Sequence, residues 1–126
     1  MTSASRFVNL TPHAIVLMDG TGEVLERVEP SGQVARVGSR PGRQIAEYAG
    51  CPVHAAPVVG GVEGLGEPVG GVIYIVSAMV AAAVVGRPDV VSPGTGPADG
   101  AVRDAGGRIL GVTRLIQSPL ADADVR

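Results

Sequence analysis

The stretch VIYIVSAMVAAAVV, residues 72–85, carries no charge and forms the main apolar run of the chain. Its 14 residues are fewer than the roughly 20 that a membrane-spanning helix needs. The run therefore predicts a buried core segment. Residues 72–76 have strong β-propensity, and Ser77 can cap a short helix of small residues over 78–85 that ends at Gly86.

The composition limits how the rest of the core is built. The chain has 126 residues, with two Tyr, one Phe and no Trp, so we expect one domain whose core is aliphatic. Ile75 and Val80 are predicted to lie in that core. Because such a core is weak, apolar surface from residues 53–85 is expected to be shared between subunits of a homo-oligomer. We place the globular domain at residues 1–117 and expect residues 118–126 to fray.

Charge and cysteine content exclude several classes of function. The formal net charge is −2, and all ten basic residues are arginine. No basic surface for nucleic acid is predicted, and neither Schiff-base lysine chemistry nor a P-loop lysine is available. The lone Cys51 excludes an intramolecular disulfide, and the N-terminus lacks a signal-peptide pattern. We expect a cytoplasmic protein with no membrane or nucleic-acid partner.

Short strands separated by turn residues are predicted on both sides of the apolar run. On the N-terminal side they cover residues 6–9, 14–18 and 23–28, and hairpin signals between them favour an antiparallel meander in the first 40 residues. Residues 43–53 fit either a short helix or a strand. Residues 102–113 predict two strands around a Gly-rich turn. The expected fold class is α+β: a small antiparallel β-barrel or sandwich-like sheet with one short buried helix.

The stretch RPDVVSPGTGPADGAVRD, residues 87–104, places prolines and glycines between two Arg/Asp pairs. It contains no Walker motif, but backbone N–H groups of Gly-rich turns bind anions, and arginines add charge-assisted hydrogen bonds. The other interpretation is a long surface connection whose pairs are structural. In the first case arginines would bind phosphate, glycines would allow close backbone approach, and His or Asp would contact polar edges. The candidate ligand-binding residues are His13, Arg36, Arg87, Asp89, Gly94, Gly96, Arg103 and Asp104.

Signals for catalysis or metal binding are weak. His13 could act as a base because its pKa lies near neutrality, or it could simply close a turn. Cys51 and His54 offer two soft ligands, whereas a zinc site needs three or four, so no metal and no cofactor are expected. We assign no catalytic residue and favour a non-enzymatic protein; a small hydrolase using His13 with Asp89 or Asp104 is an alternative.

Five segments, taken in order, resemble a family of small uncharacterised proteins of bacteria and their phages. They span about residues 6–116 and are NLTPHAI (9–15), PSGQVARV (30–37), YIVSAMV (74–80), RPDVVSPGTG (87–96) and VRDAGGRILGV (102–112). The resemblance implies a phage or prophage setting inside a bacterial host cell. That setting suggests a small anti-defence protein that sequesters an anionic, nucleotide-derived immune signal. The alternative is a phage structural or assembly accessory protein, in which the same loops contact other proteins.

Overall fold

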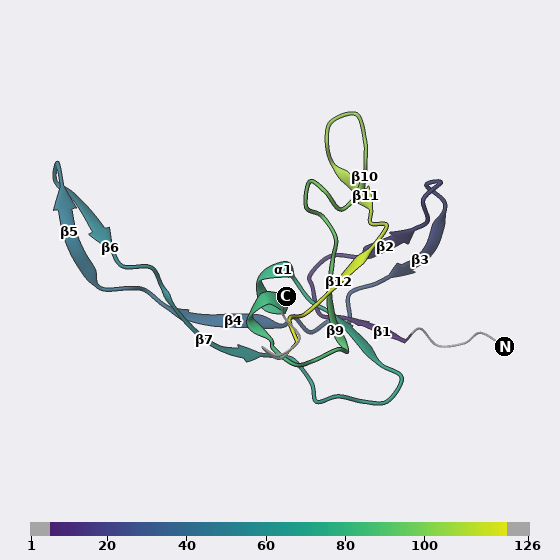
Figure 1. Cartoon of the computed structure of the whole chain (residues 1–126), viewed down its shortest axis with the longest axis horizontal. Coiled ribbons are helices and arrows are strands. Elements are labelled where there is room, and N and C mark those ends of the chain that lie inside the picture. Colours follow the sequence, from purple (N-terminus) through teal and green to yellow (C-terminus); the bar gives the residue numbers. More distant parts are fainter. Residues whose placement is uncertain (1–5, 121–126) are drawn as a thin grey trace.

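The computed structural model describes residues 6–120, with the backbone alone given at residues 39, 40, 58 and 59. Within this range the chain forms twelve short strands and one helix, which confirms an α+β fold (Figure 1). The strands are divided among several small open sheets, and no closed barrel forms in the described part of the chain. A small body and a long two-stranded arm result.

The body is built on a four-stranded sheet with the order β1-β8-β9-β12. Both β1 and β9 run parallel to β8, and β12 runs antiparallel to β9. Helix α1 (Ala78–Ala83) connects β8 to β9, because parallel neighbours need a crossover connection. The four strands are β1 (Phe7–Asn9), β8 (Ile73–Ile75), β9 (Val90–Pro93) and β12 (Leu115–Gln117).

Strand β8 is apolar throughout because both faces of the sheet are covered. Tyr74 and Val76 pack with Val80 of α1 on one face, whereas Ile75 packs with Val28 on the other. Successive strand residues point to opposite faces, so a strand covered on both sides needs an uninterrupted apolar run. The exposed fractions of Ile75 and Val80 are 0% and 3%, which confirms their predicted place in the core.

Helix α1 begins where the sequence predicts. The Ser77 Oγ accepts a hydrogen bond of 3.3 Å from the Val80 N–H, which satisfies one of the free donors of the first turn. The helix ends at Ala83, two residues before the predicted end, because Val84 adopts an extended conformation and packs into the core. Within residues 6–120 no helix is long and apolar enough to cross a bilayer.

The strand pairing at the N-terminus differs from the prediction. The hairpin of β2 (Ile15–Met18) and β3 (Val24–Val28) forms as expected. However, β1 pairs with β8, and β4 pairs with β7, so the predicted antiparallel meander is wrong. The partners of β1 and β4 come from distant parts of the chain, and hairpin signals report only on neighbouring strands.

The arm is formed by four strands that leave the body beside α1 (Figure 1). Near the body β4 (Arg36–Arg40) pairs with β7 (Val58–Glu63), and farther out β5 (Gln44–Tyr48) pairs with β6 (Cys51–His54). Ala49 and Gly50, with φ of 53° and 82°, close the outer hairpin as its turn requires. Residues 43–53 thus form a hairpin of two strands, not a helix. At about 3.3 Å per residue, the strand run from 36 to 49 reaches about 40 Å.

The C-terminal part confirms one prediction and corrects another. Strands β10 (Val102–Arg103) and β11 (Ile109–Gly111) form the predicted hairpin around a Gly-rich turn. The predicted fraying of residues 118–126 is wrong at its start, because Ser118 is 2% exposed and its N–H donates to the Val90 carbonyl at 2.9 Å. Residues 121–126 lie outside the described residues.

Candidate functional site

A cavity of about 450 Å³ lies between α1, β9 and β12, beside the turn that follows β9. Its volume is in the range of small-molecule sites, which combine apolar walls with a few polar groups. The apolar part includes Ala78 and Ala82 of α1 and Ile116 of β12. Hydroxyl and amide groups come from Ser92, Thr95 and Gln117. The cavity thus offers a planar organic ligand both contact area and hydrogen-bonding partners.

The turn that borders this cavity is held by Asp99. Its carboxylate accepts a hydrogen bond of 2.8 Å from the Gly96 N–H and lies 3.9 Å from the Arg114 guanidinium. A Cβ at Gly94 would lie 2.7 Å from the Arg114 Cγ, and one at Gly96 would lie 2.9 Å from the Asp99 carboxylate. The space beside these two glycines is therefore taken by the protein's own side chains, those of Arg114 and Asp99. Of the two, Gly96 lines the cavity and Gly94 is buried.

Arg103 lies beside the cavity, whereas Asp104 shapes a turn. The Arg103 guanidinium donates to the Thr95 carbonyl at 3.2 Å and to the Gly107 carbonyl at 3.0 Å. These bonds hold an exposed positive charge next to a residue that lines the cavity. The Asp104 carboxylate accepts from the N–H groups of Gly106 and Arg108 at 2.8 and 3.0 Å, which organises the β10–β11 turn.

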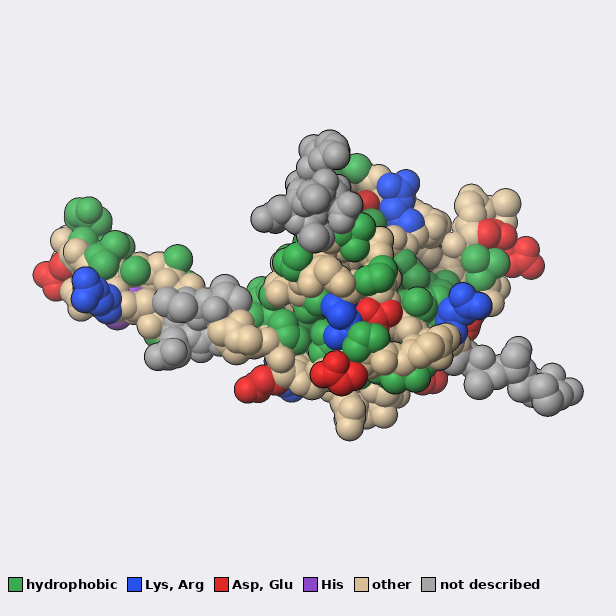
Figure 2. All heavy atoms as spheres, turned by 60° about the horizontal axis from the view of Figure 1, so that its bottom comes forward, with side chains coloured by type: hydrophobic (Ala, Val, Ile, Leu, Met, Phe, Trp, Pro, Cys, Tyr) green, Lys and Arg blue, Asp and Glu red, His purple; other side chains and the backbone are tan. Residues whose placement is uncertain are grey.

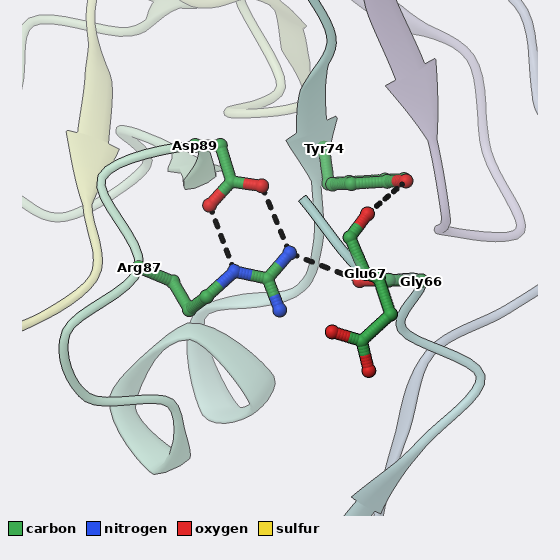
Figure 3. A network of polar contacts seen from close by, with 5 residues as sticks. All are labelled: Gly66, Glu67, Tyr74, Arg87 and Asp89. Carbon is green, nitrogen blue, oxygen red and sulfur yellow. Dashed lines mark hydrogen bonds and ion pairs between the residues drawn. The ribbon is translucent and has the colours of Figure 1, made fainter. Parts of the chain in front are cut away.

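Arg87 and Asp89 bind each other (Figure 3). The guanidinium makes two hydrogen bonds of 2.8 Å to the Asp89 carboxylate and a third of 2.9 Å to the Gly66 carbonyl. Its central carbon lies 6.0 Å from the centre of the Tyr74 ring, and the Tyr74 hydroxyl donates to the Glu67 carbonyl. This network connects the loop before β8 to the body, so these contacts give Arg87 and Asp89 a structural role.

Replacing Arg87 with alanine should therefore reduce stability. The two side chains are only 21% and 16% exposed, and the variant leaves a carboxylate without its partner, so we expect a loss of about 2–3 kcal/mol. Urea unfolding measures it. The matched control is Arg27→Ala, because the Arg27–Glu29 pair is 60% and 65% exposed and such pairs contribute only about 0–1 kcal/mol. Equal losses in the two variants would contradict the structural role.

The pH dependence of stability provides an independent check on this pair. The hydrogen bonds from Arg87 lower the pKa of Asp89 from its ordinary value. A carboxylate with a lowered folded-state pKa stabilises the fold above its unfolded pKa of about 3.9. That contribution is lost as the pH falls through the folded-state value. The stability difference between the wild type and Arg87→Ala should thus shrink below about pH 4.

The segment NLTPH is organised by the buried side chain of Asn9. Its amide donates to the carbonyls of His13 and Val28 at 2.8 and 3.0 Å, and its oxygen accepts from the N–H and hydroxyl of Thr11 at 2.9 and 2.7 Å. The His13 carbonyl also accepts from the Thr11 hydroxyl. The turn is thus closed through the backbone of His13, whose side chain is exposed.

The predicted site residues do not all meet. Arg36 is exposed in β4, opposite Glu63 across the arm, and neither Arg36 nor His13 lines the cavity. Gly96 lines the cavity, and Arg103 is hydrogen-bonded to the carbonyl of Thr95, which also lines it. The sequence-based analysis missed Asp99 and Arg114, which nothing in the local pattern distinguishes, because Arg114 approaches the turn only through the pairing of β12 with β9.

The His, Cys, Asp and Glu side chains of residues 6–120 form neither the predicted hydrolase pairs nor a metal-binding group. Among residues 6–120 no hydrogen bond or ion pair joins His13 to Asp89 or Asp104, the pairs that a hydrolase would use. In the same residues no group of three or more His, Cys, Asp or Glu side chains is close enough to hold a metal ion. The cavity is therefore the feature on which a functional proposal rests.

Comparison with known proteins yields no relative. No family model matches the chain, and neither a curated protein nor a solved structure is significantly similar to it. The resemblance to small bacterial and phage proteins accordingly stays a prediction.

Proposed function

We propose that this protein binds and sequesters an anionic, nucleotide-sized molecule without transforming it. The observation that carries the proposal is the cavity of about 450 Å³ beside the 94–99 turn. In this proposal the apolar wall formed by α1 and β12 contacts the planar part of the ligand. The hydroxyl of Ser92 and the amide of Gln117 bind its polar edges.

Two arginines beside the cavity can bring positive charge to a bound phosphate, although neither lines the cavity and the charged residue that does is Asp99. Arg103 is held at Thr95, and Arg114 is held near Asp99. Both are exposed, so their guanidinium groups can turn towards a phosphate without breaking the core. Charge-assisted hydrogen bonds from arginine are the strong contacts that phosphate recognition uses. Arg87, Asp89, Arg36 and His13 then contribute to folding or to other surfaces.

The proposed setting is a phage or prophage protein acting as a homo-oligomer inside a bacterial host cell. The open sheet edges support association, since an unpaired edge is a template for pairing with another chain. In such an oligomer, sheets of different copies would pack together into the sandwich-like arrangement that one chain does not form. A ligand taken up in such an assembly would be withdrawn from the host's immune signalling.

The first test is mass spectrometry of small molecules released when the purified protein is denatured. A panel of nucleoside mono- and diphosphates and cyclic dinucleotides is then titrated by calorimetry. Arg103→Ala should weaken binding of whichever member binds by about tenfold or more, because a charge-assisted hydrogen bond contributes about 1.5–3 kcal/mol. Its melting temperature should change little, since the side chain is exposed.

Arg108→Ala is the matched control for this binding experiment. Arg108 is an exposed arginine in the same hairpin, and it contributes its backbone N–H and carbonyl, not its side chain, to the described hydrogen bonds. It should leave the affinity unchanged. Equal affinities in the two variants, or consumption of the titrated nucleotide, would overturn the proposal.

The arm favours a second candidate function, a structural or assembly accessory. Long two-stranded projections are suited to contacts with other chains, and the described strands of this arm pair only with one another. An accessory of this kind would release no small molecule on denaturation and would show no calorimetric signal with the nucleotide panel. The two functions are thus separated by the same experiments.

A further inference from the structure

The outer side of α1 is an exposed apolar surface. Residues 78–85, which comprise α1 and the two valines after it, contain no polar side chain, and a segment that is apolar all round is normally buried. Here Val80 and Val84 face the core, but Met79 and Val85 are 74% and 61% exposed. Another apolar surface is needed to cover this side of α1.

The outer part of the arm carries a second exposed apolar surface. Tyr48 lies opposite Cys51, and Ala46 lies opposite Val53. Side chains opposite each other, and those two positions apart, share one face of a ribbon, so these four residues form a wholly apolar face. Tyr48 is 68% exposed. Figure 2 shows hydrophobic side chains gathered at the end of the arm.

These two surfaces do not meet within one chain, because the arm leads away from the body (Figure 1). We infer that the apolar face of the arm covers α1 of a second copy, reciprocally, in a two-fold exchange. The base of the arm, β4 and β7, contacts α1. A two-fold axis near the middle of the arm, about half its length from each α1, therefore brings the outer end of each arm to α1 of the other copy.

Charge and area both favour a second copy as the occupant. Neither surface carries a charge, since Glu47 lies on the opposite face of the ribbon with Pro52. A two-fold exchange makes two contacts, so each of the four surfaces must hide about 400 Å² to reach a standard interface of about 1,600 Å². Tyr48 alone would supply roughly 150 Å². The inference goes beyond ligand binding and would stand if no ligand were found.

Light scattering of the full chain at increasing concentration tests this exchange. The wild type should be at least dimeric at about 20 μM, as expected for a standard interface. Tyr48→Ser and Met79→Ser should each weaken association by more than tenfold while the far-ultraviolet circular dichroism is kept. The double variant should be little weaker than either single variant, because both remove the same contact. Leu25→Ser, at a residue 66% exposed on β3, is the matched control and should leave the mass unchanged.

Cross-linking shows which surfaces meet. Cys51 is the only cysteine of the chain, so Met79→Cys adds one thiol on α1, and a short bis-maleimide should then join the two copies covalently. Leu25→Cys should not increase the cross-linked dimer above the wild-type level. A monomeric wild type would overturn the inference. So would an assembly that persists in Met79→Ser, because the arm would then contact a surface other than α1.

Discussion

Asn9→Ala should destabilise the fold by about 3–5 kcal/mol, near the upper end of single substitutions. The side chain is 1% exposed and makes four hydrogen bonds. Its removal leaves the buried Val28 carbonyl and the buried donors of Thr11 without that partner, and the His13 carbonyl loses one of its two donors. It also leaves a cavity next to β1.

Urea unfolding at neutral pH measures this loss. Gln44→Ala is the matched control, because Gln44 carries the same functional group but is exposed on the arm and makes one local hydrogen bond. We expect the control to stay within about 0.5 kcal/mol of the wild type. A similar small change for Asn9→Ala would show that NLTPH is not held by this side chain and that its residues are free for another role.

Ile75→Ala should cost about 2–5 kcal/mol. Ile75 is fully buried in the central strand and packs with Val28 and Val91 on the face of the sheet opposite α1. The truncation removes apolar contacts and leaves a cavity that the surrounding strands can fill only in part. Thermal and urea unfolding should agree on the size of the loss.

Leu25→Ala serves as the control for the core substitution. Leu25 is 66% exposed, so its truncation should change stability by less than about 0.5 kcal/mol. If Ile75→Ala were equally mild, the position of β8 at the centre of the body would be wrong. Because Ile75 and Asn9 lie on paired strands, the two losses need not add in a double variant.

Much of the local structure could be predicted from residue patterns. The cap at Ser77, the β2–β3 hairpin and the β10–β11 hairpin depend on a few neighbouring residues, and they form where expected. The candidate site was predicted less well. Gly96 lines the cavity and Arg103 contacts its neighbour Thr95, but Arg87 and Asp89, which look equally suited to a ligand, bind each other. Sequence alone could not distinguish an arginine and aspartate that bind a ligand from an arginine and aspartate that bind each other.

The sequence by itself determined that residues 72–76 enter the core and that a short capped helix follows. In a chain of this size, the buried core is the one favourable environment for an apolar run without charge. Only the tertiary structure decided that β1 pairs in parallel with β8, that residues 36–63 leave the body as an arm, and that Arg114 meets Asp99. Those contacts join residues far apart in the chain. Their free energy depends on how the whole sheet packs. The spacing of neighbouring residues does not report on that packing, so the sequence pattern could not predict these contacts.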